Sequence, residues 1–262
     1  MASPPEVIFP TSPSDAAAAF GDGSGVTVVA GGTIVLPEIS YGRLEPAKTI
    51  VLTQAGLAGV TRSGSTVTVG AATPIAELVG LPAPLGPCAA NIADLEIRGQ
   101  ATLGGNVCAG EGHDAPRGDL QGALLAVGAT ARSAGAGGER SEPFEDFLAD
   151  RSGRLLLDVS FEEPTAGGFA ALDRPHTHDY TAMAVSAARA ADGTVRVAAT
   201  GAGTHGQRLP SAEANANDPA AAGDAAVADV TPHDDALASA WYRSKTLPVL
   251  VRRALTQLKG AS

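Results

Sequence analysis

The sequence predicts a protein of the α+β class, with short strands and short helices that both contribute to the core. Two segments, residues 26–29 and 66–70, are rich in β-branched residues, which favour strands. Ser12-Pro13-Ser14-Asp15 has Ser at the N-cap, Pro at the first helical position and an acidic residue at the third, which is typical of a helix start. Asp192-Gly193 lies between two β-capable segments and indicates a hairpin.

The remaining elements follow from the same rules. Strands are predicted at residues 49–52, 129–134 and 154–161, and helices at 74–79, 88–94, 143–148 and 233–258. Pro248 is expected to break the last helix or to start a new one. The apolar segment 120–127 is expected to be buried, and residues 209–230 are expected to form weak helix and loop. A polar, turn-rich stretch at 162–168 predicts a domain boundary.

Composition excludes several classes of function. The chain has 262 residues and a net charge of −10, so it would repel nucleic-acid phosphates. Hydrophobic residues make up 44% and aromatic residues only 4%, so the core must consist mainly of Ala, Val, Leu and Ile. The first residues lack the basic and apolar regions of a signal peptide. No apolar run is long enough to span a membrane, and a cytoplasmic location is expected.

The metal-ligating residue types are sparse. Cys88 and Cys108 cannot supply the four thiolates of an iron–sulfur cluster or a structural zinc site, and both are expected to be small apolar residues. His176 and His178 lie near Asp179 without a third ligand in reach, so they are expected to be surface residues. The sequence therefore predicts no metal site in this chain.

Two Gly-Gly turns carry the strongest functional signal. Thr102-Leu103-Gly104-Gly105-Asn106 combines a glycine pair with short polar side chains, and consecutive amides in such a turn suit phosphate oxygens. On its own this segment is equally consistent with a structural loop. Ala30-Gly31-Gly32-Thr33 follows the strand at 26–29, and the apolar residues 34–36 are expected to re-enter the core. Neither turn matches a Rossmann fingerprint or a P-loop.

These motifs, taken in order, resemble the FAD-binding medium subunit of molybdenum hydroxylases, the xanthine dehydrogenase and carbon monoxide dehydrogenase family. The resemblance covers nearly the whole chain. The matching segments are Ala30-Gly31-Gly32-Thr33 with Leu36-Pro37, then Arg98, Thr102-Leu103-Gly104-Gly105-Asn106, Asp119-Leu120, Ala238-Ser239-Ala240-Trp241-Tyr242-Arg243, and Val249-Leu250-Val251-Arg252-Arg253-Ala254-Leu255.

The resemblance implies a particular fold. Residues 1–161 would form a PCMH-type, vanillyl-alcohol-oxidase-like FAD-binding domain of two α/β subdomains with FAD between them. Residues 168–262 would form a smaller domain like the C-terminal domain of the CO dehydrogenase flavoprotein, with a three-stranded antiparallel sheet and helices.

The resemblance also implies a set of cofactor-binding residues and no catalytic residue in this chain. Amides of the first turn would wrap the FAD pyrophosphate, and the second turn would line its other side and the ribityl chain. Asp119 would accept a hydrogen bond from a cofactor hydroxyl, and Leu156 would pack near the isoalloxazine ring. The implied residues in the two turns are Ala30, Gly31, Gly32, Thr33, Ile34 and Val35, then Thr102, Gly104, Gly105 and Asn106.

The chain departs from the family pattern in two places. The loop from Ala109 to Gly118 is longer than in many members. Many members also carry a lysine near the flavin at the position of Leu172, where the nearest basic residues here are Arg174 and His176.

The resemblance implies an electron-transfer subunit. A large molybdenum-cofactor subunit and a small [2Fe-2S] subunit would be its partners, and the complex would be a dimer of heterotrimers. This chain would pass electrons from FAD to an external acceptor such as NAD⁺, a quinone, oxygen or a carrier. Two alternatives stay open: a stand-alone flavin oxidoreductase with its own substrate, and a flavin-free assembly or binding protein of the same fold.

Overall fold

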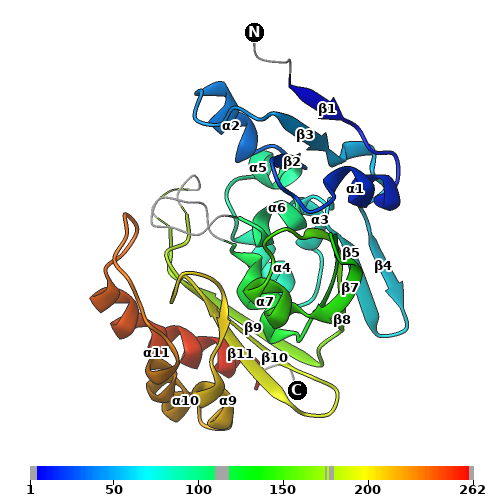
Figure 1. Cartoon of the computed structure of the whole chain (residues 1–262). Coiled ribbons are helices and arrows are strands. Elements are labelled where there is room, and N and C mark those ends of the chain that lie inside the picture. The colour runs from blue at the N-terminus through cyan, green and yellow to red at the C-terminus, as the bar shows by residue number, and fades with distance from the viewer. Residues whose placement is uncertain (1–4, 110–117, 175, 177–179, 260–262) are drawn as a thin grey trace. The chain divides into compact units, whose positions relative to one another are not determined.

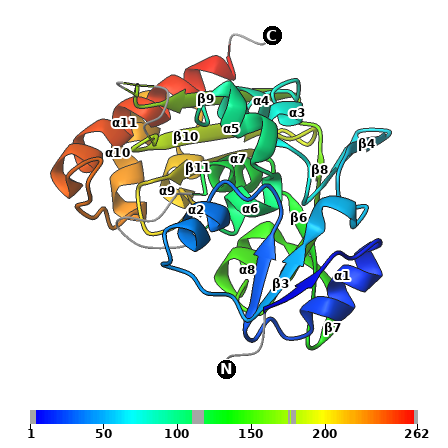
Figure 2. The same cartoon turned by 90° about the horizontal axis from the view of Figure 1, so that it is seen from above.

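The protein folds into two compact units, each made of segments that are distant in the sequence. The computed structural model (Figures 1 and 2) describes residues 5–109, 118–174, 176 and 180–259. Unit 1 contains the described residues of 1–75, 96–105 and 130–160, and unit 2 those of 76–95, 106–129 and 161–262. The two units are described one after the other.

Unit 1 begins with a small parallel sheet. Its strands β1 (Glu6–Ile8), β2 (Val26–Val29) and β3 (Lys48–Val51) lie in the order β1-β3-β2. Parallel strands need crossover connections, and these contain α1 (Pro13–Phe20) and α2 (Val35–Ser40). The predicted start of α1 is confirmed, because the Ser12 hydroxyl accepts a hydrogen bond from the Asp15 amide at 3.1 Å.

A second sheet in unit 1 has five strands in the order β4-β5-β8-β6-β7. The strands are β4 (Val60–Ser63), β5 (Thr66–Gly70), β6 (Thr130–Gly135), β7 (Gly138–Pro143) and β8 (Leu155–Glu162). A core of mostly small and aliphatic side chains joins α1 and β3 to this sheet. Ile50 and Leu157 belong to it, together with the aromatic residue Phe20. The scarcity of aromatic residues is thus matched by a core built mainly from Ala, Ile and Leu.

Unit 2 is organised around an antiparallel sheet in the order β12-β11-β10-β9. Its strands are β9 (Ala166–Ala171), β10 (Ala184–Arg189), β11 (Val195–Thr200) and β12 (Gln207–Arg208). Helix α7 (Leu120–Ala126) packs on β10 and β11, and α11 (Ala240–Gln257) packs on β9 and β10 from the other face (Figure 1). Because both faces are covered, β10 is buried at nearly every position rather than at alternate ones.

The other helices are short. They are η1 (Leu52–Gln54), α3 (Ile75–Leu78), α4 (Leu85–Ala90), α5 (Leu95–Gln100), α6 (Leu103–Val107), α8 (Phe144–Ala149), α9 (Pro210–Ala214), α10 (Pro219–Ala226) and η2 (Val227–Asp229). Within the described residues, no helix combines the length and the apolar character that crossing a membrane requires.

Several local expectations are wrong. Helix α11 continues through Pro248, because Leu247, Leu250 and Val251 are buried and their packing offsets the hydrogen bond that proline cannot donate. The sheet of unit 2 has four strands rather than three, although β12 has only two residues. Residues 103–107, expected to be a turn, form α6, and the apolar residues 35 and 36 start α2, which has no buried residue.

Candidate functional site

The first Gly-Gly turn follows β2 and presents backbone amides that the fold leaves unused. Gly32 is buried and has φ 74°, a left-handed conformation that favours glycine. The amides of Gly32, Thr33 and Ile34 donate no hydrogen bond within the described part of the chain. A buried amide without an acceptor is costly, so this turn is suited to an anionic ligand that accepts hydrogen bonds.

The first turn also lies directly against the chain that leads into the second one. A Cβ atom on Gly31 would lie 1.9 Å from the carbonyl oxygen of Gln100 and 3.1 Å from the Cα of Ala101. Only glycine permits this approach. The two segments that were singled out in the sequence are therefore brought together, and Thr102 follows the contact by one residue.

The second segment uses its amides differently. The Leu103 amide donates to the Thr73 carbonyl at 3.0 Å, and the Gly104 amide to the Ala71 carbonyl at 2.7 Å. The Gly105 amide donates to the Thr102 hydroxyl oxygen at 3.1 Å. These three donors are satisfied within the fold, so a ligand here would meet side chains and bare backbone surface rather than free amides.

The two glycines of this second segment have different roles. A Cβ on Gly104 would lie 2.9 Å from the Ala71 carbonyl oxygen, so Gly104 permits close packing inside unit 1. A Cβ on Gly105 would meet only the Thr102 hydroxyl, at 3.1 Å, and Gly105 is exposed. Gly105 therefore leaves an open backbone surface, which is where a ligand could approach.

Leu156 lies on β8, beside this segment. Ala71 connects the two, because its carbonyl accepts from the Gly104 amide and its own amide donates to the Leu157 carbonyl of β8 at 2.8 Å. The Leu156 side chain is only 3% exposed, so it offers little surface of its own to a ligand.

Asn106 and Asp119 form a hydrogen-bonded pair in unit 2. The Asn106 amide nitrogen donates to the Asp119 carboxylate at 3.2 Å, and the Leu120 backbone amide donates to the Asn106 side-chain oxygen at 2.9 Å. Asn106 thus orients the Asp119 carboxylate and also binds the first residue of α7. Asp119 is half-buried, and a carboxylate of this kind accepts hydrogen bonds.

Three further residues surround Asp119: Thr200 and Tyr180, which the sequence did not single out, and Cys88, which was expected only to be a small apolar residue. The Asp119 carbonyl accepts from the Thr200 hydroxyl at 3.3 Å and from the Cys88 thiol at 3.4 Å. Burial, and then the charge of Asp119, raises the pKa of the Tyr180 phenol above its ordinary value. The same two causes raise the pKa of the Cys88 thiol well above its usual range, which keeps it protonated. Only the fold brings these residues to Asp119, so the sequence holds no local signal for them.

Gln121 is a buried polar residue within the apolar helix α7. Its amide nitrogen donates to the Val107 carbonyl at 2.8 Å, and its oxygen accepts from the Gly206 amide at 2.7 Å. It therefore fixes the segment after Asn106 relative to α7. A polar residue inside an apolar run was the available sequence signal for this position.

The departures from the family pattern are only partly visible. Residues 110–117 of the long loop, and His178 with Asp179, lie outside the described residues. Arg174 donates to the Ala93 carbonyl at 3.1 Å, and His176 is exposed. Cys88 is buried as expected, but Cys108 is exposed, so the expectation of a small apolar residue is wrong there. In the part of the chain that the structure describes, no three metal-ligating side chains converge.

The donor set fits a dinucleotide cofactor such as FAD. Free amides at residues 32–34 can hold a diphosphate, and the stretch from Ala30 to Val35 has no carboxylate to repel it. Gly105, also in unit 1, leaves space for close approach. In unit 2, described by itself, the Asn106 and Asp119 side chains carry oxygens of the kind that accept hydrogen bonds from hydroxyl groups. When bound, the flavin supplies the electron chemistry, and these residues bind and orient it.

Comparison with known proteins shows which family the chain resembles. Residues 3–161 match the family described as the FAD binding domain in molybdopterin dehydrogenase. The chain is 27% identical to subunit alpha of the 6-hydroxypseudooxynicotine dehydrogenase complex of Paenarthrobacter nicotinovorans, over 90% of this chain and 87% of that protein. It is also 27% identical to the carbon monoxide dehydrogenase medium chain of Hydrogenophaga pseudoflava, over 94% of each chain.

The fold is similar to solved structures along its full length. A carbon monoxide dehydrogenase from Hydrogenophaga pseudoflava, solved without the Mo-pyranopterin moiety of its molybdenum cofactor, aligns with a TM-score of 0.85 and 27% identity, covering 100% of this chain and 99% of that one. The resemblance predicted from the sequence is therefore confirmed, as is FAD as the cofactor of the family. The family match alone covers more than half of the chain, and the chain thus belongs to the FAD-binding domains of molybdopterin dehydrogenases, as an FAD-dependent oxidoreductase subunit.

Proposed function

We propose that this chain is the electron-transfer subunit of a molybdenum hydroxylase complex, which receives electrons on FAD from an iron–sulfur subunit and passes them to an external acceptor. The names of the relatives support this proposal, because both are subunits of dehydrogenases. The observation that carries it is the set of unused amides at residues 32–34, packed through Gly31 against the segment that leads to Thr102.

In this proposal the chain binds and positions FAD but does not transfer protons for the substrate. The turn from Ala30 to Val35 holds the pyrophosphate, with amide donors that need no positive charge. Thr102, Gly104 and Gly105 line the cofactor beyond it. Asn106 keeps the Asp119 carboxylate in place to accept from a hydroxyl group, and Leu156 belongs to the apolar wall beside the ring. A dinucleotide suits these groups, because its diphosphate can bind the amides and its hydroxyl groups can bind the carboxylate.

The organisation of the molecule follows from the same proposal. Residues 1–161 form the PCMH-type FAD-binding domain, and residues 168–262 form the domain like the C-terminal domain of the CO dehydrogenase flavoprotein. The partners are a large subunit with the molybdenum cofactor and a small [2Fe-2S] subunit, assembled in the cytoplasm. The substrate is set by the large subunit, so several acceptors and substrates are compatible with this chain.

A stand-alone flavin oxidoreductase is the main alternative. It would need titratable side chains over the flavin, and Tyr180, whose pKa is raised by burial and by the charge of Asp119, is one titratable group in unit 2. Turnover of a substrate by the purified chain alone would favour this alternative. A flavin-free assembly protein is a further alternative, and it would purify without colour.

Glycine substitutions test the cofactor site directly. Gly32→Val places a branched side chain at φ 74°, where a Cβ already lies 2.6 Å from Leu36, and Gly105→Val fills the open surface. Both are expected to purify without bound FAD, measured by flavin absorbance per chain. Gly99→Val is the matched control, because a Cβ there meets no atom within 4 Å. Full FAD content in both site variants would refute the assignment of the two turns.

A further inference from the structure

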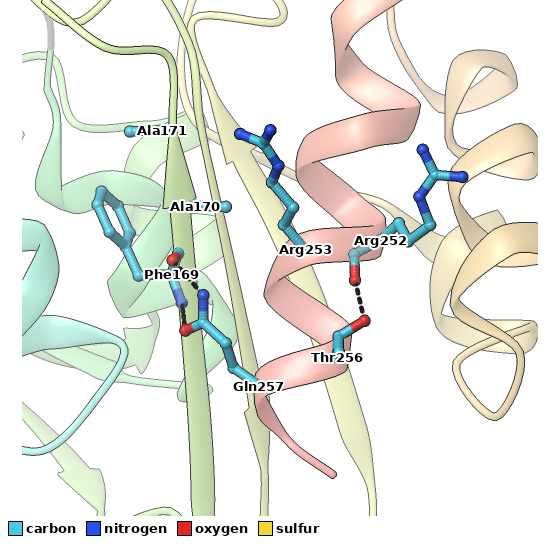
Figure 3. A pocket seen from close by; sticks show the side chains of 7 residues that line it. All are labelled: Phe169, Ala170, Ala171, Arg252, Arg253, Thr256 and Gln257. Carbon is cyan, nitrogen blue, oxygen red and sulfur yellow. Dashed lines mark hydrogen bonds between the residues drawn. The ribbon is translucent and has the colours of Figure 1, made fainter. Parts of the chain in front are cut away.

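A hollow of about 410 Å³ lies in unit 2 between β9 and the last turns of α11 (Figure 3). Its floor on the β9 side is apolar and its α11 side is polar and basic. The lining residues are Phe169, Ala170 and Ala171 on β9, and Arg252, Arg253, Thr256 and Gln257 on α11. None of these seven lining residues takes part in the proposed binding of FAD.

Strand β9 is an edge strand, and among the described residues a side chain covers its open side at Phe169. The main chain of Leu172 bonds to Met183 on the β10 side, so the alternate residues Phe169 and Ala171 direct their N–H and C=O groups away from β10. At Phe169 the Gln257 side chain takes the place of a neighbouring strand, since it accepts from the amide at 3.0 Å and donates to the carbonyl at 2.8 Å. At Ala171 no side chain does this among the described residues, and the edge is open to pairing there.

The helix beside this edge is basic in a chain that is acidic overall. Helix α11 contains four basic residues and no acidic residue, although the whole chain has a net charge of −10. Arg243 is buried and paired with Asp235. Arg252 and Arg253 are exposed, and neither guanidinium has a hydrogen-bond or ion-pair partner within the described residues.

The two exposed arginines leave the helix in opposite directions. In Figure 3 the Arg253 side chain extends from α11 on the side of β9, near the level of Ala170 and Ala171. The Arg252 side chain extends on the other side of the helix. Arg253 is therefore the cation that faces the open edge, and Arg252 provides a neighbouring arginine of equal charge that does not.

We propose that this hollow binds an extended, acidic segment of a partner subunit. The segment's main chain pairs with the outward N–H and C=O of Ala171, and one of its carboxylates binds the Arg253 guanidinium. Edge pairing supplies affinity and the charge pair supplies specificity and register. This inference rests on the proposed function, because it assigns the occupant to a subunit of the same complex.

A protein segment fits these features better than other anionic partners. An anionic membrane would be repelled by a chain of net charge −10, and a flat bilayer surface does not enter a hollow beside a strand edge. A small anion would use Arg253 but would leave the open main-chain groups of Ala171 unpaired. An extended acidic segment satisfies both.

The test compares Arg253→Glu with Arg252→Glu in this chain, co-expressed with the large and small subunits of the proposed complex. We expect Arg253→Glu to weaken co-purification of the partner subunits by roughly tenfold or more, since a charge pair becomes a charge repulsion. Arg252→Glu carries the same charge change, but the Arg252 guanidinium lies on the side of α11 away from β9 (Figure 3), so this variant is expected to assemble as the unaltered chain does. Retained FAD in both variants, measured by flavin absorbance, shows that both are folded.

A photo-crosslinking residue at Thr256 identifies the occupant. The expected product joins this chain to an acidic stretch of a partner subunit, and it disappears in the Arg253→Glu background. Equal assembly of the two Glu variants, or a crosslink to a second copy of this chain, would overturn the inference while leaving the FAD assignment intact. Vesicles of anionic lipid that bind the isolated chain through Arg253 would overturn it too. Failure of the unaltered chain to assemble, or to hold FAD, would refute the proposed function itself.

Discussion

At the residue scale, the candidate site depends on where side chains are missing as much as on where they are present. Gly31 lets the first turn approach Gln100, and Gly105 leaves bare backbone in the second segment. The polar part of the site depends on one amide, since Asn106 binds both Asp119 and the start of α7. Substitutions of these residues should therefore change stability or FAD binding more than similar substitutions at surface positions outside the site.

Asn106→Asp is expected to destabilise the protein by about 1–3 kcal/mol at pH 7, because a carboxylate replaces the amide that donates to Asp119. Two carboxylates at this distance raise the folded-state pKa of the pair. The destabilisation is therefore absent below the unfolded pKa of about 4, grows as the pH rises through the raised pKa, and is complete above it. Urea unfolding between pH 4 and pH 8 measures this dependence.

Asn106→Ala serves as the control, because it removes the same hydrogen bonds without adding a charge. Its destabilisation should vary much less with pH. If both variants lose the same stability at every pH, the Asn106 and Asp119 side chains are not in contact in solution.

At the element scale, strands and capped helices were predictable and long-range contacts were not. The β-branched runs at 26–29 and 66–70, and the Asp-Gly hairpin, correspond to β2, β5 and the β10–β11 pair. Local sequence determines such elements because turns and caps are local interactions. The continuity of α11 through Pro248 was not predictable, since it depends on packing against strands far away in the chain. The same holds in the site, where the glycine turns were visible in the sequence but the roles of Tyr180 and Thr200 were not.

Helix α11 is held at its first turn by a buried ion pair. Arg243 is fully buried and donates to both carboxylate oxygens of Asp235 at 2.8 and 3.0 Å, and also to the carbonyls of His233 and Ala238 at 2.6 and 2.9 Å. These bonds organise the irregular segment before the helix. Buried pairs of this kind contribute little net free energy when intact, but are costly when one partner is lost.

Arg243→Met is accordingly expected to lower the free energy of unfolding by about 3–5 kcal/mol, because the Asp235 carboxylate stays buried without its partner. Chemical denaturation of the purified chain measures this loss. Arg252→Met on the same helix is the control and should change stability by less than about 0.5 kcal/mol, since its side chain is exposed. A loss of similar size in the two variants would show that Arg243 has no special structural role.

At the scale of the whole molecule, the residues that the sequence predicts for the cofactor are divided between the two units. The first turn, Thr102, Gly104, Gly105 and Leu156 belong to unit 1, whereas the Asn106–Asp119 pair belongs to unit 2. The family match from residue 3 to residue 161 includes segments of both units. A ligand that binds only the folded chain stabilises it, and the stabilisation grows with the logarithm of the ratio of free ligand concentration to dissociation constant. Binding of the cofactor and stability of the fold should therefore be measured together.

The most direct test of the account is a titration of the flavin-free chain with FAD and, separately, with FMN, followed by calorimetry and by thermal unfolding. The account predicts that one FAD binds per chain and raises the melting temperature. It also predicts that FMN binds much more weakly, because FMN lacks the diphosphate that the free amides of Gly32, Thr33 and Ile34 would hold. Equal affinity for FAD and FMN, or no binding of either, would contradict it.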